Sequence, residues 1–111
     1  MVIIPTVVAT DAPCTGLSVI YNDDETFNSY LFYPKNPEAV IVDSDVIAKS
    51  PVKFLVAGMG DALGTYFEAR ACQRTDAPSL EFGGITRSAM ALCKLCYETL
   101  KEYGAAAKHA C

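Results

Sequence analysis

One aspartate in the second half of the chain has unusually small neighbours. The stretch Gly58-Met-Gly-Asp61-Ala-Leu-Gly64 keeps a helical pattern, yet it contains three glycines, each of which costs a helix about 0.5–1 kcal/mol relative to alanine. On a helix at 100° per residue, Asp61 lies opposite a wide apolar face, and its own face consists mostly of Ala57, Gly58, Gly64 and Thr65. Such a face is solvated, packs closely on another helix, or leaves room for a ligand to reach the carboxylate. A solvated face would usually carry Lys, Glu or Gln, so the pattern indicates a site without defining its chemistry.

A second polar cluster follows a short apolar segment at residues 2–4. Asp11 lies there among three threonines, Thr6, Thr10 and Thr15. Loops at the carboxyl ends of strands in α/β sheets commonly bind ligands, and hydroxyls beside a carboxylate suit a sugar or polyol. The alternative is a turn in which Asp11 hydrogen-bonds to its own backbone, which is common. The residues leave both interpretations open.

Other classes of function are less compatible with the composition. Cys93 and Cys96 have CxxC spacing, but they lie in mid-helix without a second pair, so we expect buried thiols. The five cysteines, an odd number in a chain without a secretion signal, favour free thiols and a cytoplasmic location. The net charge of −4 argues against nucleic acid as a partner. No apolar run reaches about 18 residues, so we expect no membrane span.

The elements that position these residues change in kind at Ser50-Pro51. Before this point we expect short strands: residues 2–4, a hairpin formed by 17–21 and 30–33, and a strand at 39–43 buried on both faces. After it we expect two helices, joined by a polar loop at 73–85. The first would have Ser50 as its N-cap, and the second would begin near Thr86 and stop at Gly104. The predicted fold class is therefore α/β followed by all-α, with units at 1–50 and 51–111.

Five segments resemble a known family, in the same order along the chain. They are Thr10-Asp-Ala-Pro13, Tyr30-Leu-Phe-Tyr-Pro-Lys-Asn-Pro37, Phe54-Leu-Val-Ala-Gly-Met-Gly-Asp-Ala-Leu63, Phe67-Glu-Ala-Arg-Ala-Cys72 and Leu92-Cys-Lys-Leu-Cys-Tyr-Glu-Thr-Leu100. They are similar to bacterial glycerol dehydrogenases, which are zinc-dependent members of the iron-containing alcohol dehydrogenase family. The resemblance implies that residues 1–50 end a Rossmann-like NAD-binding domain. It also implies that residues 51–111 begin a helical, metal-binding domain.

The resemblance assigns roles to both unusual stretches. Asp61 matches a ligand of the catalytic Zn²⁺, and Asp11 matches an acid that contacts the substrate glycerol. In such an enzyme zinc would lower the pKa of a glycerol hydroxyl, and hydride would pass to NAD to give dihydroxyacetone. The glycines would then clear space for metal, substrate and cofactor, and no residue of this chain is expected to act directly as a catalytic acid or base. The segment along the nicotinamide end of NAD would comprise Thr6, Val7, Val8, Ala9, Thr15, Leu17 and Tyr21.

The chain also departs from the family. The family's phosphate-binding glycine-rich loop would lie upstream of these residues, and its two zinc-ligating histidines would lie beyond residue 111. The single histidine, His109, matches neither and is expected at the surface. One carboxylate cannot form a three-ligand zinc site, so the chain resembles the middle third of an enzyme. The alternative is a catalytically silent, truncated fragment that self-associates or pairs with a partner to cover its sheet edges; either way we expect a homo-oligomer.

Overall fold

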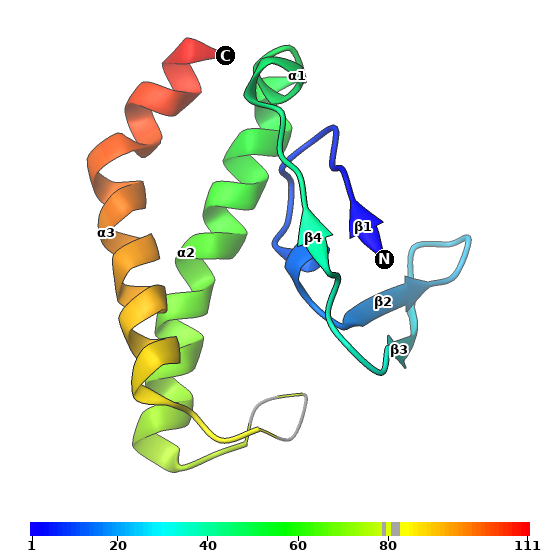
Figure 1. The fold of residues 1–111 in the computed structure, drawn as a ribbon, viewed down its shortest axis with the longest axis vertical. Helices are drawn as coiled ribbons and strands as arrows, with labels where there is room; N and C mark the ends of the chain where they lie inside the picture. The colour runs from blue at the N-terminus through cyan, green and yellow to red at the C-terminus, as the bar shows by residue number, and fades with distance from the viewer. Residues whose placement is uncertain (79, 81–82) are drawn as a thin grey trace.

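The computed structural model describes residues 1–78, 80 and 83–111. Two long helices lie side by side and run in opposite directions, and the strands and loops of the first half lie on the other side of α2 (Figure 1). Within the described residues, no helix combines the length and the apolar character needed to cross a bilayer. The elements in chain order are β1 (Val2–Ile3), the 3-10 helix η1 (Ala12–Cys14), β2 (Leu17–Tyr21), β3 (Phe27–Phe32), β4 (Ala39–Val40), α1 (Ser44–Ala48), α2 (Val52–Thr75) and α3 (Arg87–Ala110).

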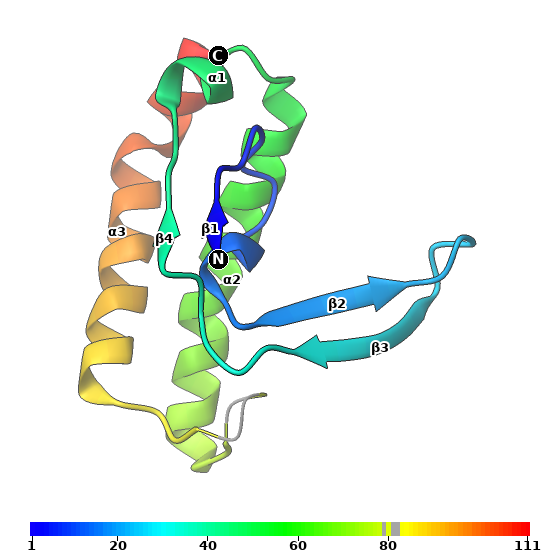
Figure 2. The same cartoon turned by 45° about the vertical axis from the view of Figure 1, so that its right-hand side comes forward.

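The strands form two separate pairs. β1 and β4 are parallel, with Val2 opposite Ala39, whereas β2 and β3 are antiparallel, with Val19 opposite Tyr30. This antiparallel pair is the predicted hairpin, although its second strand begins at Phe27 rather than at residue 30. The hairpin projects away from the helices (Figure 2).

The segment 39–43 differs from the prediction of a strand buried on both faces. Only Ala39 and Val40 pair with β1, and the side chains of Ile41 and Val42 are 53% and 55% exposed. Asp43 instead caps α1, an element that the sequence did not predict, because its side chain accepts hydrogen bonds from the amides of Asp45 and Val46. The apolar β-branched run obscured this capping signal, although aspartate is a preferred N-cap.

Both ends of the long helices depend on contacts that the sequence only partly revealed. The prediction that Ser50 caps α2 was wrong. The hydroxyl of Ser50 donates to the carbonyl of Ile47, and Pro51 occupies the N-cap position. Thr86 caps α3 as expected, accepting from the amide of Ala89. α3 does not stop at Gly104 but continues to Ala110. A side chain at Gly104 would meet the sulfur of Met59 at 3.3 Å, so this glycine permits close packing against α2 instead of ending the helix.

Aromatic rings and small residues join α2 to α3. The rings of Tyr66 and Tyr97 stack with centroids 4.9 Å apart, and Phe67 meets Tyr97 edge-on. The thiol of Cys96 lies 3.9 Å from the carbonyl oxygen of Ala62. Cys93 and Cys96 are both free, but they are half-buried rather than buried as expected.

The described residues bury little apolar surface among themselves. The accessible surface is 8072 Å², whereas a compact monomer of this mass would expose about 5,900 Å². In the described part of the chain, Ile47 is the one large apolar side chain that is buried, at 9% exposure, and the rings of the hairpin strands are exposed. The exposed surfaces of the strands and the outer faces of the helices are therefore available for contacts with other protein chains.

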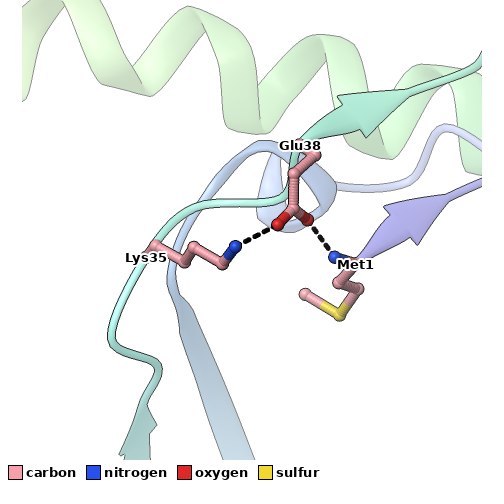
Figure 3. A network of polar contacts seen from close by, with 3 residues as sticks. All are labelled: Met1, Lys35 and Glu38. Carbon is pink, nitrogen blue, oxygen red and sulfur yellow. Dashed lines mark hydrogen bonds and ion pairs between the residues drawn. The ribbon is translucent and has the colours of Figure 1, made fainter.

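A small charged cluster ties the start of β1 to the residue before β4. The carboxylate of Glu38 forms ion pairs with the Lys35 ammonium group and with the amino group of Met1 (Figure 3). These two donors lower the pKa of Glu38 to about 2, with Lys35 the larger cause. All three groups are exposed, so the cluster contributes only modestly to stability.

We expect Glu38→Gln to remove a small stabilisation that is present at neutral pH and absent in acid. Because folding lowers the pKa of Glu38 from 4.5 to about 2, its stabilisation is fully present above pH 4.5 and is lost as pH falls towards 2. Urea unfolding at several pH values should show the wild type slightly more stable at neutral pH, with the difference vanishing across this window. A difference that stays constant with pH would contradict the assignment.

Candidate functional site

The two aspartates singled out in the sequence meet in the structure. Asp11 comes from the loop before η1, and Asp61 comes from the middle of α2. The backbone amide of Asp11 donates a hydrogen bond of 3.0 Å to Oδ2 of Asp61, across 50 residues of sequence. Asp11 occupies the N-cap position of η1, but its side chain makes no capping hydrogen bond. The loop therefore presents both the amide and the carboxyl group of Asp11 to α2.

The proximity of the two carboxyl groups changes the acidity of Asp11. Burial raises the pKa of Asp11, although part of the residue stays exposed, and the negative charge of Asp61 raises it further. A hydrogen bond between the two side chains and the charge of Glu68 act in the same direction. The negative charge of Asp61 disfavours the ionised form of Asp11, and a proton or a cation between the two carboxyl groups would offset this repulsion. The pair is thus chemically suited to a proton, a metal ion or a hydroxyl-bearing ligand.

A cavity of about 600 Å³ opens beside the two aspartates. This volume lies within the range of pockets that bind small molecules. Its walls come from the loop, η1, β2 and α2, so both halves of the chain contribute to it. Five residues expected at a substrate, cofactor or metal site are among those that line it: Thr10, Asp11, Ala12, Thr15, Leu17, Ser18, Val19, Tyr21 and Asp61.

The remaining predicted cofactor residues do not line this cavity. These residues are Thr6, Val7, Val8 and Ala9. Val8 lines a smaller space of about 190 Å³ beside α2, and Asp11 and Gly58 line the same space. The structure therefore brings Thr15, Leu17 and Tyr21 to the cavity with both aspartates, whereas Val8 meets Asp11 at the neighbouring space.

Two polar residues of the cavity wall carried no assignment from the sequence. Thr10 was noted only as one of several hydroxyls, and its side chain accepts from the amide of Ala12, which shapes the start of η1. Ser18 lies in β2 and forms a hydrogen bond of 3.2 Å with the Tyr33 hydroxyl of the neighbouring strand segment. Strand alternation alone does not predict Ser18 at the site, because it assigns Ser18 to the opposite face from its neighbours Leu17 and Val19.

The donor set at this site does not form a zinc site by itself. Among the described residues, no three His, Cys, Asp or Glu side chains come together in a way that could hold a metal ion. Asp11 and Asp61 supply carboxylates only, whereas a catalytic zinc site has three protein ligands, usually including histidine. His109 lies in the exposed last turn of α3. The residues that the structure describes would therefore give zinc at most a partial ligand set.

Comparison with known proteins gives a consistent result. No protein-family model matches the chain. Glycerol dehydrogenase from Thermotoga maritima is 54% identical over 108 residues, and the match covers 97% of this chain but 30% of the relative. Glycerol dehydrogenase from Citrobacter freundii is 52% identical over 110 residues, covering 99% of this chain and 30% of the relative. The crystal structure of glycerol dehydrogenase from Schizosaccharomyces pombe superposes with a TM-score of 0.91 at 38% identity, covering 96% of this chain and 27% of that one.

These matches show which proteins the chain resembles, in fold and in sequence. The arrangement of short strands followed by two long helices is shared with solved structures described as glycerol dehydrogenases. In sequence, the chain is homologous over nearly its whole length to glycerol dehydrogenases, which confirms the resemblance found in the sequence. The chain spans about 30% of the length of these relatives. The order of strands before helices also agrees with the predicted fold class, whereas the boundary at residues 50 and 51 stays a prediction.

Proposed function

We propose that this chain is a segment of an NAD-dependent glycerol dehydrogenase that converts glycerol to dihydroxyacetone. The observation that carries the proposal is the contact between Asp11 and Asp61 on the wall of the 600 Å³ cavity. The identity of 52–54% to glycerol dehydrogenases supports the same function. A polyol fits such a wall because carboxylates accept hydrogen bonds from its hydroxyl groups, and the hydroxyls of threonine and serine both donate and accept them.

Each half of the chain has its own part in this proposal. Residues 1–50 would end a Rossmann-like NAD-binding domain, with the nicotinamide end of NAD along Thr15, Leu17 and Tyr21 and near residues 6–9. Residues 51–111 would begin the helical domain, in which Asp61 gives one carboxylate to Zn²⁺. The other zinc ligands would come from outside the described residues. Asp11 would accept a hydrogen bond from glycerol, and we propose a cytoplasmic, homo-oligomeric enzyme.

A second candidate rests on the exposed apolar surface. The accessible area of 8072 Å² leaves broad faces that another copy or a partner chain could cover. In this case the 111 residues would be a catalytically silent fragment that acts only through self-association. The two candidates make different predictions for the segment when the rest of a glycerol dehydrogenase surrounds it. The first predicts oxidation of glycerol with NAD, and the second predicts no reaction.

A chimeric enzyme separates these candidates. The 108 matched residues of the Thermotoga maritima glycerol dehydrogenase would be replaced by this chain, and the parent enzyme would serve as the control. We expect the chimera to bind metal and to reduce NAD in a glycerol-dependent reaction at a rate comparable to that of the parent. A folded, metal-loaded chimera without this activity, together with a self-associated isolated chain in light scattering, would favour the silent fragment.

A further inference from the structure

The backbone of the first half of the chain lies against α2 at Gly58. A Cβ atom built on Gly58 would lie 1.9 Å from the carbonyl oxygen of Val8, 2.9 Å from its carbonyl carbon and 3.2 Å from the carbonyl carbon of Ala9. The obstructing atoms belong to the backbone, so no side-chain rotation can relieve the overlap. A residue larger than glycine would therefore push the loop away from the helix.

The other glycines of this helix stretch do not share this property. A Cβ at Gly60 would meet nothing within 4 Å, and one at Gly64 would make only an ordinary contact at 3.7 Å with the carboxylate of Glu68. None of the described glycines has a positive φ, so the requirement at Gly58 is steric. The expectation that all three glycines clear space for a ligand does not describe Gly58, because the chain's own backbone fills that space.

The contact at Gly58 and the hydrogen bond at Asp61 both hold the loop on the helix. Gly58 and Asp61 are three residues apart and so lie on the same side of α2, one turn from each other. Val8 and Asp11 are also three residues apart in the loop. Val8 packs on Gly58, and the amide of Asp11 donates to Asp61. The loop is thus fixed at two points along the helix.

We propose that Gly58 is a positioning residue that sets the separation between the carboxyl groups of Asp11 and Asp61. Any added side chain must move the Val8 carbonyl outward by about 1 Å or more, and a displacement of this size at a reacting site can reduce rates by about 100-fold. The loop would carry the Asp11 amide and carboxyl group away from Asp61. The consequence for catalysis rests on the proposed function, whereas the consequence for loop geometry does not.

The geometric part is tested in this chain with Gly58→Ala, and Gly60→Ala serves as the matched control on the same helix. Amide hydrogen exchange measured by NMR should show the Asp11 amide exchanging about tenfold faster in Gly58→Ala, because its hydrogen bond to a carboxylate is lost. Gly60→Ala should leave that amide unchanged, and circular dichroism should show that both variants keep their helices. An Asp11 amide that stays protected in Gly58→Ala, or loses protection equally in both variants, would overturn the proposal.

The catalytic part is tested with Gly58→Ala in the chimeric enzyme, and the unmodified chimera serves as the control. In Gly58→Ala we expect kcat/KM for glycerol to fall about 100-fold, with a clear rise in KM. A purely structural effect would lower the fraction of folded enzyme and hence kcat, without changing KM. An unchanged KM in Gly58→Ala would overturn the positioning role, whereas an inactive unmodified chimera would refute the proposed function and leave hydrogen exchange to decide the geometry.

Discussion

Replacing Asp61 with asparagine in the chimeric enzyme is expected to remove metal and activity together. Asparagine keeps the shape of the side chain and an oxygen that can accept from the Asp11 amide, so the loop contact is preserved. The negative charge that would bind Zn²⁺ is lost. Changes in the residues around metal ligands typically cost 10–100-fold in affinity or activity, and loss of a ligand should cost at least as much. Metal content measured by mass spectrometry and the glycerol-dependent rate should fall in parallel.

The control for this prediction is Glu98→Gln, which removes one carboxylate from α3. Glu98 is exposed and lies 3.7 Å from the Lys94 ammonium group, so its loss should have little effect on metal, activity or stability. NAD binding should survive in the Asp61→Asn variant, because the proposed cofactor residues lie in the first half of the chain. If Asp61→Asn keeps its full metal content and turnover, the assignment of Asp61 is wrong and the small-residue face is a packing surface.

The Asp11→Asn substitution should behave differently. The hydrogen bond to Asp61 uses the backbone amide of Asp11, so this variant keeps the contact that fixes the loop. It loses the carboxylate that would accept from glycerol, and a hydrogen bond to a charged group is worth about 10–100-fold in kcat/KM. We therefore expect bound metal to be retained while KM for glycerol rises.

A side-by-side measurement of metal content and KM in the two variants distinguishes their roles. Loss of metal in Asp11→Asn, to the degree seen in Asp61→Asn, would show that both carboxylates ligate the ion. That result would be chemically reasonable, because the charge of Asp61 acts on the carboxyl group of Asp11. It would contradict the separate substrate and metal roles proposed here.

Local signals in the sequence predicted those elements that depend mainly on local interactions. The hairpin was predicted correctly because β-branched and aromatic runs flank a polar turn, and the turn is closed by short-range bonds such as that from Thr26 to Asp24. The start of α3 was predicted from a threonine cap. The predictions that failed concern residues whose type is compatible with more than one structural role. Gly104 packs against Met59 instead of ending α3, and Asp43 caps α1 instead of ending a strand.

For the site, the sequence by itself determined which residues stand out: an aspartate among glycines on one helix, and a second aspartate in a threonine-rich loop. These features depend on residue type and helical period, which are local. Only the tertiary structure decided that the amide of Asp11 donates to Asp61 across 50 residues, and that Gly58 rather than Gly60 or Gly64 touches the Val8 carbonyl. The physical reason is that packing between distant segments depends on the position of whole backbones in space. Neither the spacing of residues nor their chemistry specifies that position on its own.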